Sequence, residues 1–164
     1  THNYDSGIYV IKGGEVRVTG AIDLARASTF ILQGASLIVE QNVEFTNHFG
    51  AFVAREHSGT IGDIRIANHV TQMDGVYIAG EASQIQSLEG YTDPTATDTA
   101  HKLQVNGNLI GDLSHLLSFR RYIGSVASTP EPSLIVAFDL RILESTPPIL
   151  EQFLGQDWRE EVSQ

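Results

Sequence analysis

The sequence predicts an all-β protein: a single-stranded right-handed parallel β-helix (solenoid) with a capping segment and an extended C-terminal arm. First, short segments place branched or apolar residues two positions apart, which is the side-chain period of a β-strand. Second, Gly, Asn or Asp separates these segments, as corners that need a positive φ require. Third, the segments return at intervals suited to stacked coils. The clearest are Val16–Val18, Leu37–Val39, Ile64–Ile66, Val76–Ile78 and Leu103–Val105.

The intervals between these segments support a repeating coil. Val16 precedes Leu37 by 21 residues, Leu37 precedes Ile64 by 27, and Ile64 precedes Ile85 by 21. A coil of about 20–25 residues accommodates this spacing. The longer interval predicts an inserted loop near residues 47–50 or 57–59. The competing architecture, an antiparallel sandwich, needs tight hairpin turns, and Asn106-Gly107 is the only good candidate for one.

Three segments depart from the strand pattern. We expect a solenoid over residues 1–128, with a protruding Thr- and Asp-rich loop at 89–100 and a cap near 109–122. In the cap, Leu113, Leu116 and Leu117 can form one helical turn over an open end of the solenoid. Residues 129–164 form a Pro-bearing C-terminal arm that includes a strand-like run at 134–138. The arm either packs back along the solenoid or docks on a neighbouring subunit.

Composition excludes several classes of protein. The formal net charge of −10 argues against a nucleic-acid partner and against an anionic membrane surface. The chain has no Cys, which excludes disulfides, thiolate metal sites and a Cys nucleophile. No apolar run reaches the length of a membrane span, so we expect no membrane insertion in this segment. The chain begins at Thr1 and its single Met is Met73, so we expect a processed or excised piece.

A resemblance to known proteins is carried by several segments in the second half of the chain. They are residues 70–79, residues 103–111, the later run Arg120-Arg121-Tyr122 and the Pro-bearing stretches that follow it. In this order they resemble the C-terminal segments of uncharacterised surface-exposed β-solenoid proteins of candidate-phyla bacteria. The resemblance spans about residues 60–160 and implies a β-helical architecture and an extracellular or cell-surface location. It implies no established activity. Residues 59–66 are also similar to a coil of the bactofilins, polymer-forming β-helical cytoskeletal proteins, which leaves end-to-end polymerisation open.

The sequence contains no recognised catalytic or metal-binding pattern. The six histidines lack the i, i+4 spacing of a helical zinc site. Several β-helix enzymes cleave acidic polysaccharides with Asp and Arg or Lys on one face, but nothing here selects a pair from Asp63, Asp74 and Arg65. Asp63, Asp74 and Asp112 each adjoin Gly, which predicts corner residues.

We expect no cofactor. Calcium is an alternative, for which Asp93 and Asp98 in the loop at 89–100 offer carboxylate ligands.

The expected function is that of a non-enzymatic structural module of a cell-surface or extracellular protein. It self-associates through the solenoid ends, the arm or both, as a homo-oligomer or with neighbouring domains of the same surface protein. The candidate interaction residues are Tyr91, Asp93, Arg120, Arg121, Ile135, Phe138, Phe153 and Trp158.

Two alternatives remain open. A carbohydrate- or receptor-binding adhesin domain predicts a row of exposed aromatic residues, and Tyr77, Tyr91 and Phe49 are the first to examine. A polysaccharide-acting β-helix enzyme needs two carboxylates that converge in a cleft.

Overall fold

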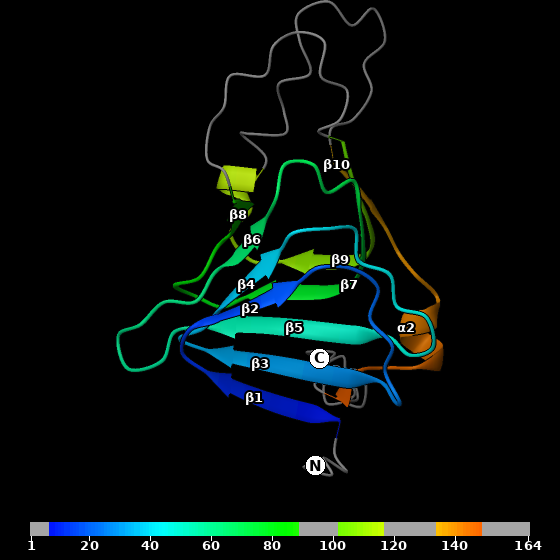
Figure 1. Cartoon of the computed structure of the whole chain (residues 1–164), viewed down its shortest axis with the longest axis horizontal. Helices are drawn as coiled ribbons and strands as arrows, with labels where there is room; N and C mark the ends of the chain where they lie inside the picture. The colour runs from blue at the N-terminus through cyan, green and yellow to red at the C-terminus, as the bar shows by residue number, and fades with distance from the viewer. Residues whose placement is uncertain (1–6, 89–101, 117–133, 149–164) are drawn as a thin grey trace, which may run out of the picture.

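Two all-parallel β-sheets face each other across one core in the computed structural model, which describes residues 7–88, 102–116 and 134–148 (Figure 1). The predicted loop at 89–100 and residues 117–122 of the predicted cap lie outside these residues. Sheet A has six strands, in the order β1 (Ile8–Lys12), β3 (Ser28–Gln33), β5 (Gly50–Arg55), β7 (Gln72–Ala79), β9 (Leu103–Ile110) and β10 (Leu134–Ala137). Sheet B has four strands, in the order β2 (Glu15–Val18), β4 (Ser36–Val39), β6 (Ile64–Ile66) and β8 (Ile85–Ser87).

Successive strands alternate between the two sheets from β1 to β9, and each strand from β1 to β7 pairs in parallel with the strand two elements further along. This arrangement places equivalent positions of successive repeats directly opposite one another. Val16 lies opposite Leu37, Leu37 opposite Ile64, and Ile64 opposite Ile85. The spacing predicted from the sequence is therefore confirmed residue by residue in sheet B.

The longer interval between β4 and β6 contains a tight turn. His57 and Thr60 exchange two backbone hydrogen bonds of 2.9 and 3.0 Å, and Ser58 and Gly59 between them have φ values of 52° and 79°. Two central residues with positive φ are typical of a type I′ turn. The inserted loop predicted at residues 57–59 is confirmed.

The Asn106-Gly107 dipeptide does not form the hairpin turn for which it was the candidate. Both residues lie inside β9, opposite Asp74 and Gly75 of the parallel strand β7. A Cβ atom on Gly107 would lie 1.9 Å from the carbonyl oxygen of Gly75. The glycine therefore serves the close approach of two strands, and the antiparallel sandwich loses its one candidate hairpin turn.

Aromatic residues form a ladder inside the core. Tyr9, Phe30, Phe52 and Tyr77 occupy matching positions on β1, β3, β5 and β7, and their rings stack with centroid distances of 5.0, 5.0 and 5.6 Å. Offset stacking of this kind stabilises beyond the buried area alone. Fully buried aliphatic side chains fill the space between the ladder and sheet B, among them Leu32, Leu37, Ile64, Ile66, Met73 and Ile85.

Polar side chains tie adjacent repeats together outside the strands. Asn42 accepts hydrogen bonds from the backbone N–H groups of Thr71 and Gln72, at 2.8 and 3.1 Å. Asp63, directly before β6, accepts one from the backbone N–H of Gln84 at 3.0 Å. These contacts satisfy backbone donors that no strand partner reaches.

The corner interpretation holds for two of the three predicted Asp residues. Asp63 lies at a corner, and Asp112 accepts the backbone N–H of Ser114 at 2.9 Å where residues 114–116 turn into a helix. That hydrogen bond lowers the pKa of Asp112. Asp74 lies within β7, so the corner interpretation is wrong for it.

Replacing Phe52 by Ala should remove the central rung of the aromatic ladder. We expect the free energy of unfolding, measured by urea denaturation, to fall by about 3–5 kcal/mol because a buried aromatic leaves a cavity. Phe138→Ala is the matched control: this side chain is 61% exposed, and its removal should change stability by less than about 0.5 kcal/mol. Equal effects of the two variants would contradict a core built around the ladder.

Candidate functional site

Residues 138–148, here called the returning arm, pack against the outer face of sheet A. The strand-like run predicted at 134–138 forms β10, and the chain then turns back through the short helix α2 (Arg141–Glu144). Ile142 of α2 is buried against Phe49, Ala51 and Val76 in a small apolar cluster outside the main core. The arm therefore crosses the outer face of sheet A, in which β10 is the last strand (Figure 1).

The returning arm extends from the last strand of sheet A to the first. Pro148, at its end, lies beside Gly7, which directly precedes β1: a Cβ built on Gly7 would be 3.4 Å from the Pro148 ring. Between these ends, His48 Nδ1 lies 3.1 Å from the Ser145 hydroxyl. Of the two courses left open by the sequence, the described part of the arm follows its own chain.

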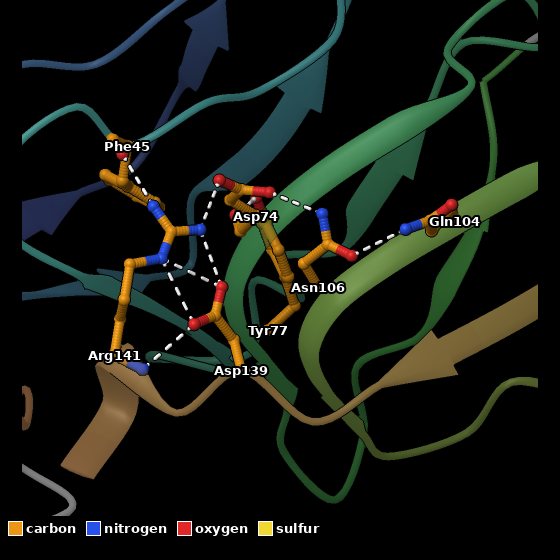
Figure 2. A network of polar contacts seen from close by, with 7 residues as sticks. All are labelled: Phe45, Asp74, Tyr77, Gln104, Asn106, Asp139 and Arg141. Atoms are coloured by element: carbon orange, nitrogen blue, oxygen red, sulfur yellow. Dashed lines mark hydrogen bonds and ion pairs between the residues drawn. The ribbon is translucent and has the colours of Figure 1, made fainter.

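Arg141 is the centre of the polar contacts that hold the arm (Figure 2). Its Nε donates to both carboxylate oxygens of Asp139, at 3.1 and 2.9 Å, and one terminal nitrogen donates to Asp139 at 2.6 Å and to Asp74 at 2.7 Å. The other terminal nitrogen donates to the carbonyl oxygen of Phe45 at 2.9 Å. The guanidinium also lies 5.5 Å from the centre of the Phe49 ring, within the range of a cation–π contact.

Asp74 is the buried partner, with a side chain only 6% exposed. Its second carboxylate oxygen accepts a hydrogen bond from Asn106 at 2.9 Å, and Asn106 accepts one from Gln104 at 2.8 Å. The backbone of Asp74 donates to Val43, and its carbonyl accepts the Tyr77 hydroxyl at 2.7 Å. A buried carboxylate is tolerable when paired and hydrogen-bonded in this way.

Electrostatics favour the charged forms of Asp139 and Arg141 and the neutral form of Tyr77. Hydrogen bonds from Arg141 lower the pKa of the Asp139 carboxyl, and hydrogen bonds to Asp139 and Asp74 raise the pKa of Arg141. Burial, reinforced by the charge of Asp74, raises the pKa of the Tyr77 hydroxyl well above its ordinary value. At neutral pH a charged Arg141 thus binds an ionised Asp139, and a neutral Tyr77 phenol donates to the backbone carbonyl of Asp74.

The predicted carboxylates do not converge. Asp63 lies beside sheet B, 3.5 Å from Arg65 and 3.0 Å from Gln86, whereas Asp74 is on sheet A and holds Arg141. In the described ranges, no three His, Cys, Asp or Glu residues are grouped so as to hold a metal ion. Within the same ranges, no helix is long and apolar enough to span a membrane.

The structure describes two of the predicted interaction residues. Ile135 lies in β10 and is 44% exposed, and Phe138 begins the returning arm and is 61% exposed. Tyr77 and Phe49 are fully buried, so neither belongs to the exposed aromatic row that the adhesin alternative needs. The remaining predicted residues fall outside the described ranges: Tyr91, Asp93, Asp98, Arg120, Arg121, Phe153 and Trp158.

Sequence reasoning missed Arg141, the residue on which the arm depends. Its local signal is the pair Asp139 and Arg141 directly after a strand, and α2 uses Asp139 to accept the Arg141 backbone N–H at 2.9 Å. Its partner on sheet A, Asp74, is 67 residues earlier in the chain. Spacing within a segment carries no information on such a contact.

A comparison with protein-family models, with curated proteins and with solved structures found no match to this chain.

Replacing Arg141 by Gln should release the arm and leave Asp74 without its cation. We expect the free energy of unfolding to fall by about 1–2 kcal/mol, the lower part of the range for charged hydrogen bonds because water reaches the half-exposed guanidinium. Limited proteolysis should also cleave the arm faster. Arg17→Gln is the matched control, since Arg17 bridges Glu15 and Glu40 on the surface of sheet B and is 54% exposed. Its replacement should leave stability and cleavage unchanged.

Acid should loosen the arm through Asp139. Because its pKa is lower in the folded protein than in the unfolded chain, its charge stabilises the fold above about pH 4, and this contribution is lost as the pH falls through the folded pKa. Hydrogen exchange of the amides at 141–145 should therefore accelerate in acid beyond its intrinsic rate. Asp139→Asn should reduce protection at neutral pH and flatten this pH dependence, whereas Asp112→Asn, remote from the arm, should keep the parental profile.

Proposed function

We propose that this chain is a non-enzymatic structural module that associates with further copies of itself at the β10 edge of sheet A. The observation that carries the proposal is an edge strand with exposed apolar side chains on both faces. In the surface proteins that its sequence resembles, such a module would belong outside the cell or on its surface. Neighbouring domains of the same protein would then be alternative partners for the same edge.

The proposal includes a specific fold: a single-stranded right-handed parallel β-helix, of which sheets A and B are two faces. The alternation of successive strands between two parallel sheets supports this interpretation. Right-handedness follows from the general preference of crossover connections between parallel strands. Stacked coils bury their side chains against neighbouring coils, and the last coil lacks such a neighbour.

The edge at β10 has the properties of a docking strand. Among the strands that the structure describes, only β9 pairs with β10, so within these residues the other edge of β10 has no strand partner. Ile135 and Val136 are consecutive and therefore point to opposite faces of the sheet, and they are 44% and 46% exposed. An exposed apolar edge is a template for pairing with another strand, which proteins otherwise protect with charge or Pro.

The hydrogen bonds of Asp63, Asp74 and Asp139 favour a structural role for these carboxylates. Asp74 and Asp139 both bind Arg141, and Asp63 accepts hydrogen bonds from the next repeat. A general acid or nucleophile would need a carboxylate oriented toward a substrate. In this network the carboxylate oxygens instead hold the arm and the corners in place.

Ile135→Lys should abolish self-association because a charged side chain on an edge strand opposes strand addition. We expect the parental chain to show concentration-dependent species larger than a monomer by size-exclusion chromatography with light scattering. The variant should remain a monomer over the same concentrations. Negative-stain imaging of the parental chain then separates a closed dimer from an extended polymer.

Ile61→Lys is the matched control, since Ile61 is an aliphatic side chain, 52% exposed, outside the strands of both sheets. It introduces the same charge and should assemble as the parental chain does. A parental chain that stays monomeric at all concentrations, or equal assembly of both variants, would refute association at β10.

A further inference from the structure

A row of β-branched aliphatic side chains crosses the outer face of sheet A. Val10 lies opposite Ile31, Ile31 opposite Val53, Val53 opposite Ile78, and Ile78 opposite Ile110, so the row extends over five strands. Val10 and Ile110 at its two ends are 50% and 44% exposed, and the three residues between them are partly buried. We call these five residues the aliphatic row. It is the continuous outward apolar feature of the largest sheet.

Different neighbours border the two sides of the aliphatic row. Two residues earlier along the strands, the returning arm covers Ala51 and Val76 with Ile142. Two residues later, Lys12, Gln33 and Arg55 are in register on β1, β3 and β5, with Lys12 and Arg55 exposed. The row is thus a narrow apolar strip between the arm and two cations. A strip of this width suits one segment of chain lying along it.

The chain itself supplies a suitable segment at the end of this strip. The described part of the arm ends at Pro148, which lies beside Gly7 at the start of β1, and sixteen residues follow it. Ile149, Leu150, Phe153 and Leu154 have the i, i+1, i+4, i+5 spacing of one apolar helix face, and Gly155 is a helix stop signal. Four acidic residues accompany them, opposite in charge to Lys12 and Arg55: Glu151, Asp157, Glu160 and Glu161.

The lengths agree as well. Five adjacent strands span four inter-strand distances of about 4.8 Å, or about 19 Å in total. A helical stretch of six residues covers about 9 Å of this length. The ten residues after it, when extended, reach further than the part of the row that is left. Residues 149–164 can therefore follow the whole row, from β1 back toward β9.

We propose that residues 149–164 dock on the aliphatic row of their own chain, antiparallel to the returning arm. The apolar face at 149–154 covers the row near β1, and Trp158 covers it further along. The acidic residues face Lys12 and Arg55. This intramolecular contact is separate from association at β10 and does not depend on it.

Trp158 is the only tryptophan of the chain, so its fluorescence reports on this contact directly. In the full-length protein we expect blue-shifted emission and weak quenching by acrylamide, both independent of protein concentration. Ile110→Asp, at an exposed end of the row, and Val53→Asp, at its centre, should shift the emission to that of the urea-unfolded chain and raise the quenching constant. Circular dichroism checks that both variants keep the fold, and Ile110→Asp is the safer of the two because its side chain is 44% exposed.

Ile61→Asp is the matched control and should leave the emission of Trp158 unchanged. Ile135→Lys should leave it unchanged too, which separates this contact from self-association. Emission that already equals that of the unfolded chain, or variants in the row that behave like Ile61→Asp, would overturn the proposal. Protection of Trp158 that disappears on dilution would overturn it as well, because a second copy would then supply the segment.

Discussion

Parallel in-register pairing is the constraint from which the rest of this structure follows. When equivalent positions of successive repeats lie opposite one another, similar side chains at matching positions form continuous rows across the strands. Inside the molecule this produces the stack of Tyr9, Phe30, Phe52 and Tyr77. On the outer face of sheet A it produces the aliphatic row from Val10 to Ile110. The same arrangement explains why Asn42 and Asp63, at corners, satisfy backbone groups of the next repeat.

Apolar and ionic contacts both hold the returning arm, and they have different roles. Ile142 supplies burial, whereas Arg141 fixes where along the sheet the arm sits, because its donors are directed at Asp74, Asp139 and the Phe45 carbonyl together. Asp74 on β7 would be an unfavourable residue to bury without this cation. The body of the protein and its arm therefore require each other: the arm needs the sheet for packing, and the sheet needs the arm for charge compensation.

The sequence was most informative where structure is determined locally. The two-residue period of the strands and the glycines between them predicted the pairing of Val16, Leu37, Ile64 and Ile85. Gly107 kept the antiparallel alternative open because a glycine needed for a close approach between strands looks the same in sequence as one needed for a turn. The burial of Tyr77 and Phe49 could not be decided from the sequence, because alternation shows that a side chain points to one face without showing which face is inside. Arg141 escaped because its buried partner is distant in the sequence.

The arm has a consequence for how the molecule comes apart. A stack of repeats in which each contacts only its neighbours can fray from either end, one repeat at a time. Here one segment joins β10 to the residue before β1 and rests on β5 and β7 between them. Loosening either terminal strand then also costs contacts made at the centre of the sheet, so the two ends are energetically linked. The arm thereby converts a linear array into a closed cooperative unit, whose opening resembles that of a single globular domain more than the unzipping of a repeat protein.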